Sequence, residues 1–258
     1  MALLAACYAC SSAGAAEPAS PPIGASSPFP AGASISRHSR RDSADFRGEA
    51  ASRDTRNVAD WVIASGDNNS LPFMIVDKVD AKVFLFDGRG EMRGAAAALL
   101  GLGRGDHSVA GIGQRRLATI SPEERITPAG RFIAALGHDL EQDVLWIDYN
   151  AALSLHRVIV GGQKDRRFER LASPSPLDNG ISYGCINVPV AFYNEIVSPA
   201  FKGTVGIVYI LPESKSIREV FAIPDAVFEA GPDAGPARRD KVWERSYFLE
   251  DSRRTAAR

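Results

Sequence analysis

A cysteine in a short glycine-containing run is the residue of this sequence best suited to covalent chemistry. Cys185 lies in the run Ile-Ser-Tyr-Gly-Cys-Ile-Asn over residues 181–187. We expect a helix from Val188 to Val197 directly after this run, with Asn187 as its N-cap. Main-chain N–H groups at the start of a helix favour an anion, so this position predicts a thiol that ionises readily. The alternative is a cysteine buried as an ordinary apolar residue.

A thiolate nucleophile needs a neighbouring base, and His156 is our candidate. It lies in a predicted strand from Ser154 to Val160. The alternation of side chains along a strand places it on the same face as Ser154. A histidine packed in the core is the alternative. His107 and His138, which stand in glycine-flanked loops, are rival bases.

The residues around the cysteine suit the support of a reacting carbonyl group. Gly184 allows the backbone to approach a substrate closely, and the N–H groups of Gly184 and Cys185 could donate to an oxyanion. Ser182 could orient His156 or hold a substrate, or it could simply close a turn through its hydroxyl. Asn187 could bind a substrate as well as cap the predicted helix.

Short runs rich in β-branched and aromatic residues predict the elements that position these groups. Several such runs, with turn signals such as Asp87-Gly88 between them and one well-marked helix, indicate a mainly β domain. The predicted strands are Phe73–Lys78, Ala81–Phe86, Val144–Tyr149, Ser154–Val160 and Thr204–Leu211.

Two motifs resemble those of the L,D-transpeptidase (YkuD-type) catalytic domain, found in the cysteine enzymes that cross-link bacterial peptidoglycan. That family carries a His, a spacer, then Ser/Thr-His-Gly-Cys, an apolar residue and Asn or Arg, and residues 182 and 184–187 fit this order. The segment Thr-Pro-Ala-Gly-Arg-Phe at 127–132 is similar to the family's Thr-Pro-x-Gly-x-Phe. The resemblance covers about residues 70–212. It implies a mainly β, L,D-transpeptidase-like β-sandwich with one or two short helices.

The resemblance also implies roles for the candidate residues. Cys185 would attack the carbonyl of the third residue, a diamino acid, in a peptidoglycan tetrapeptide stem, with His156 as the base and no cofactor. The remaining candidates would support the oxyanion (Gly184, Tyr183 and Ser182) or bind the substrate (Asn187 and Arg157). The acyl group would pass to an amine of a second stem, giving a 3-3 cross-link, or to a protein. An L,D-carboxypeptidase with water as acceptor and a catalytically inactive peptidoglycan-binding module are the alternatives.

Three departures from the family pattern predict a divergent branch with altered specificity or lost activity. Tyr183 stands where the family has a second His, and its hydroxyl can donate a hydrogen bond but cannot act as a cation near neutral pH. Arg157 follows the candidate base where the family often has Gly. The spacer from His156 to Ser182 has 25 residues, and its extra length at 163–179 predicts an enlarged active-site loop. The basic side chains near this loop could hold the stem's carboxylates or form a solvated surface; they are Arg157, Lys164, Arg166, Arg167 and Arg170.

Composition excludes several classes of protein. The chain of 258 residues carries 30 Lys and Arg against 31 Asp and Glu, and a net charge of −1 argues against a protein built mainly to bind nucleic acid. No apolar run reaches the roughly 18 residues that a bilayer-spanning helix needs. No two histidines stand three or four positions apart with carboxylates nearby, so no metal site is predicted.

The N-terminal segment predicts an exported protein. Residues 1–16 are apolar and then small, as in a secretory signal, although a disordered alanine-rich terminus is the alternative. The run Leu-Ala-Ala-Cys at 4–7 resembles a bacterial lipoprotein cleavage box, which would make Cys7 a lipid anchor. We expect a monomer in the periplasm or cell envelope. The predicted organisation is a signal-like segment at 1–16, a disordered proline-rich linker at 17–57, the catalytic domain at 58–212 and a charged C-terminal extension at 213–258.

Overall fold

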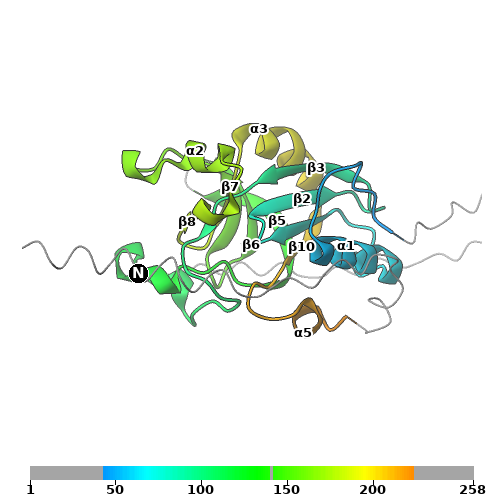
Figure 1. The fold of residues 1–258 in the computed structure, drawn as a ribbon, viewed down its shortest axis with the longest axis horizontal. Coiled ribbons are helices and arrows are strands. Elements are labelled where there is room, and N and C mark those ends of the chain that lie inside the picture. The colour runs from blue at the N-terminus through cyan, green and yellow to red at the C-terminus, as the bar shows by residue number, and fades with distance from the viewer. Residues whose placement is uncertain (1–42, 140–141, 224–258) are drawn as a thin grey trace, which may run out of the picture. The chain divides into compact units, whose positions relative to one another are not determined.

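Two β-sheets frame the folded part of the chain (Figure 1). The computed structural model describes residues 43–139 and 142–223. Its strands are β1 (Phe73–Asp77), β2 (Lys82–Phe86), β3 (Met92–Ala97), β4 (Leu100–Gly101), β5 (Gly130–Asp139), β6 (Gln142–Asp148), β7 (Leu153–Arg157), β8 (Gly180–Ser182), β9 (Ile186–Val188) and β10 (Val205–Ile210). Eight of them form a mixed sheet in the order β3-β2-β1-β10-β5-β6-β7-β9, and β4 pairs with β8. The predicted mainly β class is confirmed.

The helices are short, and the described residues hold more of them than the one or two expected. They are α1 (Arg53–Ser65), α2 (Arg167–Ala172), α3 (Val190–Phe192), α4 (Ser198–Phe201) and α5 (Ile217–Phe221). A π-helical turn, Tyr193–Val197, joins α3 to α4. Figure 1 shows α1 and α5 at one side of the large sheet, away from α2 and α3.

The central strands β1 and β10 are buried on both faces, as their unbroken apolar sequences require. They run parallel, with Phe73 opposite Ile207. Alternate residues of β1 enter two separate cores, Met74 one and Ile75 the other. The second core, which contains Ile75, is closed by apolar residues of α1 and α5.

The first core draws the two ends of the large sheet together. Leu85 of β2 belongs to the same buried cluster as Leu145 of β6 and Leu155 of β7. Leu99, in the segment that follows β3, pairs with Asn187 of β9, so the two edges of the sheet meet and its apolar faces oppose each other as in a sandwich. Phe192 and Phe201, from α3 and α4, cover the same core.

The predicted boundary between linker and domain at residue 57 is wrong. Helix α1 begins at Arg53, and the Ser52 hydroxyl caps it by accepting from the Thr55 N–H at 3.1 Å. Phe46 is also buried, with its ring edge-on to that of Phe86 at 5.1 Å between centroids. The mixed-charge composition suggested a linker here, because the apolar residues of the helix lie on one face only.

The predicted C-terminal extension begins as part of the domain rather than as a separate segment. Helix α5 has a capping box between Ser216 and Glu219, and Ile217 and Phe221 enter the second core. The signal-like segment, the linker up to residue 42 and the extension beyond residue 223 lie outside the described residues. Within the described ranges, no helix combines the length and apolar character needed to cross a membrane.

Candidate active site

Parallel pairing of β7 with β9 brings the predicted nucleophile and base together. Leu155 pairs with Ile186, and both side chains are fully buried in the first core. Cys185 directly precedes β9 and therefore lies level with Ser154. Because side chains alternate along a strand, Ser154, His156 and Cys185 share the side opposite that core.

The Cys185 thiol and the His156 imidazole are neighbours, and each shifts the pKa of the other. His156 Nδ1 lies 2.7 Å from the carbonyl oxygen of Arg157. Since a carbonyl can only accept, Nδ1 carries a hydrogen, and Nε2 is the nitrogen left to accept the thiol proton. The carbonyl thus fixes both the tautomer and the orientation of the ring.

The pKa shifts of the two groups are both toward their charged forms. Burial opposes the charged form of Cys185, but hydrogen bonds from His156 and Ser154 outweigh it and lower the thiol's pKa below its ordinary value. Burial likewise opposes the charged form of His156, but the bonds to Cys185 and to the Arg157 carbonyl raise its pKa. Cys185 as a whole residue is half-buried.

Ser154 is a site residue that sequence reasoning did not single out. Its buried hydroxyl donates to Cys185 Sγ at 3.6 Å, and its main-chain N–H also helps to lower the thiol's pKa. The carbonyl of Ala152, 3.4 Å from Sγ, accepts from the neutral thiol instead. The signal was available, because strand alternation had already placed Ser154 on the face of His156.

Hydrogen bonds within the turn at 182–185 fix the backbone of the cysteine. Ser182 Oγ donates to the Cys185 carbonyl at 2.6 Å and accepts from the Gly184 N–H at 3.0 Å. Ser182 therefore closes the turn. The Gly184 N–H, one of the two expected oxyanion donors, already donates to Ser182. Glycine itself is required here, since φ is +129° and a Cβ would lie 2.8 Å from the Ile126 carbonyl oxygen.

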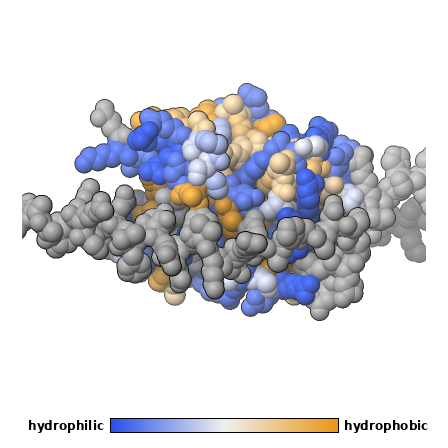
Figure 2. Space-filling view, viewed as in Figure 1, coloured by the Kyte–Doolittle hydropathy of each residue, from blue (hydrophilic) through white to orange (hydrophobic). Residues whose placement is uncertain are grey.

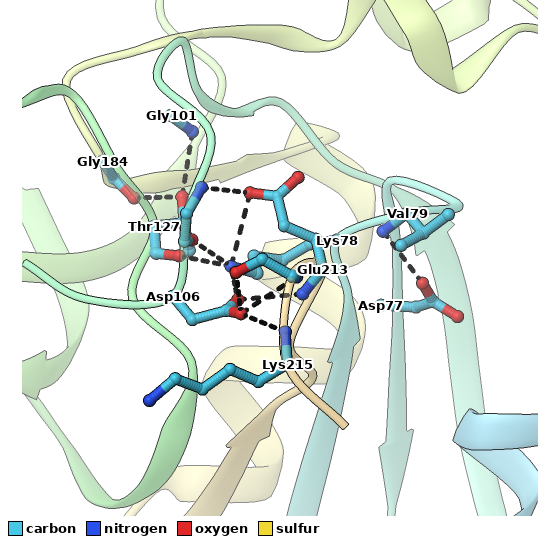
Figure 3. Close-up of polar contacts among 11 residues, drawn as sticks. Asp77, Lys78, Val79, Gly101, Asp106, Thr127, Gly184, Glu213 and Lys215 are labelled. Carbon is cyan, nitrogen blue, oxygen red and sulfur yellow. Dashed lines mark hydrogen bonds and ion pairs between the residues drawn. The ribbon is translucent and has the colours of Figure 1, made fainter. Parts of the chain in front are cut away.

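A buried ion pair stands behind this turn (Figure 3). Thr127 Oγ1 donates to the Gly184 carbonyl at 2.7 Å and accepts from the Gly101 N–H at 2.9 Å. The carbonyl of Thr127 accepts from Lys78 Nζ at 3.1 Å. Lys78 Nζ also lies 2.8 Å from Asp106 Oδ1, and these two side chains are only 3% and 1% exposed. Thr127 thus joins the buried charges to the residue before the cysteine.

The helix expected directly after the cysteine does not begin at Asn187, so its predicted capping role is wrong. Residues 186–188 form β9 instead, because Ile186 is needed in the core, and α3 begins only at Val190. The Asn187 side chain is buried. It donates to the Cys185 carbonyl at 3.2 Å and accepts from Arg167 Nη1 at 3.1 Å. The lowered thiol pKa therefore comes from neighbours on β7 and not from a helix terminus.

The Arg157 side chain, expected to bind the substrate, makes contacts within the fold. Arg157 points to the face of β7 opposite His156. Its Nη1 forms an ion pair with Asp143 at 2.8 Å, and its Nε donates to Asn194 Oδ1 at 2.6 Å. The guanidinium also lies over the Tyr193 ring, 4.1 Å from its centroid. Only its carbonyl takes part in the site.

The enlarged loop at 163–179 contains α2 between two short 3-10 turns. The surface at the end of the molecule that carries α2 is mostly hydrophilic in Figure 2. Tyr183 is 38% exposed, and the guanidinium of Arg125 lies 4.0 Å from its ring centroid.

The rival bases His107 and His138 are exposed. Of the histidines in the described ranges, His156 is the one paired with Cys185.

No group of three or more His, Cys, Asp or Glu side chains suited to a metal ion occurs among residues 43–139 and 142–223.

Comparison with known proteins gives only distant similarities. No family model and no curated protein matches the sequence. One similar structure is a fused Zn-dependent amidase/peptidase/peptidoglycan-binding domain-containing protein from Clostridium acetobutylicum, with 16% identity and a TM-score of 0.32 over 55% of this chain and 52% of that one. Another is the helical cell shape determining protein Pgp2 from Campylobacter jejuni, with 15% identity and a TM-score of 0.35 over 60% and 55%. The chain spans about half the length of these structures. These descriptions apply to those proteins alone.

Proposed function

We propose that this protein is a peptidoglycan L,D-transpeptidase, a cysteine acyltransferase that remodels the cell wall. The observation that carries the proposal is that the half-buried residue Cys185, whose thiol pKa is lowered, neighbours an imidazole whose tautomer leaves Nε2 to act as a base. The two family-like motifs converge on this pair, since Thr127 of the first motif bonds to Gly184 of the second.

The reaction divides into two acyl transfers. Cys185 Sγ forms a bond to the carbonyl carbon of the diamino acid, and the bond from that carbon to the nitrogen of the terminal D-alanine breaks. The proton on His156 goes to the departing amine. In the second transfer an acceptor amine attacks the thioester, its proton goes to His156, and the thiolate leaves.

The oxyanion of each tetrahedral intermediate needs donors close to the sulfur. We assign the main-chain N–H of Cys185 to this role, because the Gly184 N–H already donates to Ser182. The hydroxyl of Tyr183 is the second donor. This arrangement uses one main-chain donor where the sequence suggested two.

The acceptor defines the product. An amine of a second stem gives a 3-3 cross-link, and an amine of a protein gives an attachment to the wall. We assign the activity to the cell envelope, after export by the signal-like segment at 1–16, with the protein acting as a monomer.

Intact-mass analysis of the full chain tests the proposal. Incubation with a tetrapeptide stem should add the mass of the tripeptide acyl group to the protein and release D-alanine. Cys185→Ala should show neither. A second stem peptide should then convert the adduct into a cross-linked peptide; release of free tripeptide alone would identify a carboxypeptidase. No adduct, from a protein whose Cys185 still reacts with iodoacetamide, would overturn the enzyme in favour of a binding module.

A further inference from the structure

A cavity of about 600 Å³ lined by three arginines lies beside the candidate active site. Tyr183, two residues before the cysteine, forms part of its wall. Arg167 reaches from this wall to Asn187, two residues after the cysteine, at 3.1 Å. The other lining residues are Leu102, Arg125, Asp165, Arg170, Leu177, Asp178, Gly180 and Ile181. The cavity therefore adjoins both flanks of Cys185 in the sequence.

The three guanidinium groups are held in place by the protein. Arg125 donates through Nε and Nη2 to the Ile120 carbonyl, at 3.3 and 3.2 Å. Arg170 donates through Nε to the Asp165 carbonyl at 2.7 Å and through Nη1 to the Asp178 carbonyl. Arg167 donates to Asp165 at 3.1 Å and to Asn187. Because these hydrogen bonds already fix each guanidinium group, little side-chain entropy is lost when a ligand binds.

Each guanidinium group keeps one terminal NH2 group that donates to no acceptor in the described residues. Within those residues, no acceptor is engaged by Arg125 Nη1, Arg167 Nη2 or Arg170 Nη2. Two carboxylates, of Asp165 and Asp178, also line the cavity. Asp165 forms an ion pair with Arg167. Two carboxylates against three guanidiniums leave the lining with one positive charge in excess. The cavity thus offers positive charge with directed donors.

The apolar part of the wall sets the rest of the ligand's chemistry. Leu102, Leu177 and Ile181 line the cavity together with the guanidiniums. A ligand that matches both parts carries carboxylate on a short aliphatic chain. The third residue of a peptidoglycan stem, when its side chain ends in a carboxylate, has this chemistry and sits at the bond to be cleaved.

We propose that this cavity binds the side-chain carboxylate of the diamino acid whose carbonyl Cys185 attacks. The inference rests on the proposed function for the identity of the peptide. The proposal also explains the contact between Arg125 and Tyr183. The Arg125 guanidinium over the ring supplies a positive charge that the tyrosine itself cannot carry. The insertion at 163–179 then acts in substrate selection, since it contributes Arg167 and Arg170.

Binding measurements on the full-length Cys185→Ala protein test this cavity without relying on turnover. Two tetrapeptides are compared by calorimetry, one with the free side-chain carboxylate and one with that group amidated. We expect the free acid to bind about tenfold or more tightly, the scale of a hydrogen bond to a charged group. A third peptide, amidated at its C-terminus only, should bind like the free acid, and a loss there instead would place the terminal carboxylate in the cavity and overturn the assignment.

Substitutions locate the effect. Arg125→Gln and Arg170→Gln should each weaken binding of the free acid about tenfold and leave the side-chain amide almost unaffected. Arg166→Gln is the matched control, because Arg166 neighbours α2 but is 67% exposed and pairs with Glu169 outside the cavity. Equal binding of acid and amide, undetectable binding of both, or an equal loss in Arg166→Gln would overturn the inference.

The outcomes separate this inference from the proposed function. If the peptide acylates Cys185 of the wild-type protein but amidation changes nothing, the cavity assignment fails and the transpeptidase remains. If discrimination depends on Arg125 and Arg170 but no acyl-enzyme forms, the cavity assignment stands and the proposed activity fails. Circular dichroism of each variant confirms that a loss of binding is not a loss of fold.

Discussion

Removal of the Asp106 carboxylate should be among the most destabilising single changes in the described part of the chain. Asp106 and Lys78 are almost completely buried and lie 2.8 Å apart (Figure 3). In Asp106→Ala, Lys78 Nζ keeps the carbonyls of Gly105 and Thr127 and a carboxylate oxygen of Glu213 at 3.5 Å, but loses its close counter-ion. Breaking a buried pair from one side costs about 3–5 kcal/mol, and we expect the lower end of this range because the longer ion pair with Glu213 stays behind.

The other bonds of Asp106 add less to this figure. Its carboxylate also accepts from the N–H groups of Glu213, Ser214 and Lys215, at 2.8, 2.9 and 2.8 Å. Ser214 and Lys215 are exposed, so water can replace the lost acceptor there. The buried ion pair therefore decides the magnitude, which is a large part of the 5–15 kcal/mol that typical domains possess.

Urea denaturation at pH 7 measures the effect. Glu169→Gln is the control, since it breaks an ion pair with Arg166 whose side chains are 62% and 67% exposed, and such pairs contribute about 0–1 kcal/mol. An Asp106→Ala variant no less stable than Glu169→Gln would refute the argument that burial makes the first pair essential.

The same pair predicts a dependence of stability on pH. Burial opposes ionisation of Asp106, but hydrogen bonds from Lys78 and Ser214 outweigh it and hold its pKa well below the ordinary value. A depressed folded-state pKa gives stability that is complete above the unfolded-state pKa of about 4 and is lost as pH falls toward the folded-state pKa. Wild-type stability should therefore fall more steeply below pH 4 than that of Asp106→Asn, and parallel curves would contradict the assignment.

Three further predictions concern the site and the domain boundary. Ser154→Ala removes a donor to Sγ, so the pKa of Cys185 should rise and alkylation by iodoacetamide near neutral pH should slow about tenfold for each unit of rise; an unchanged pH profile would remove Ser154 from the site. His156→Ala should abolish acylation by a carbapenem, whereas His107→Ala and His138→Ala should keep it, and the reverse pattern would move the base. Phe46→Ala should cost about 3–5 kcal/mol in a urea titration, because the ring is 5% exposed; a cost under about 1 kcal/mol would return Phe46 to the linker.

The strands were predictable where the sequence is locally decisive. Phe73–Lys78 and Ala81–Phe86 were expected and form β1 and β2, because β-branched and aromatic residues fill both runs. The domain that contains helix α1 was expected to begin only at residue 58, since charged residues precede the apolar stripe of this helix. The cap at Ser52, followed three positions later by Thr55, was the signal that would have extended it.

Non-local pairing explains what the sequence could not supply. The three-residue strand β9 is too short to outweigh Pro189, which suggests a helix start, and it forms only because Leu155 and Ile186 meet across the insertion at 163–179. The role of Asn187 depended on that pairing. Once β9 replaces the helix start, Asn187 becomes a buried link to Arg167. The orientation of Arg157, by contrast, follows from the alternation of side chains along β7.

The origin of the thiol's low pKa has a mechanical consequence. A helix terminus would have accompanied the cysteine as one rigid element, but here the donors stand on β7 and the sulfur on the turn before β9. Their distance therefore depends on the β7–β9 register and on the support that Thr127 gives to Gly184. Lys78 holds Thr127 from behind, through its carbonyl. A change at Lys78 or Asp106 that leaves the protein folded should consequently still lower the reactivity of Cys185, although neither residue touches the sulfur. Stability and thiol reactivity are thus coupled through one threonine, and Thr127→Val, which keeps the side-chain shape and removes both Oγ1 bonds, separates this path from a general loss of stability.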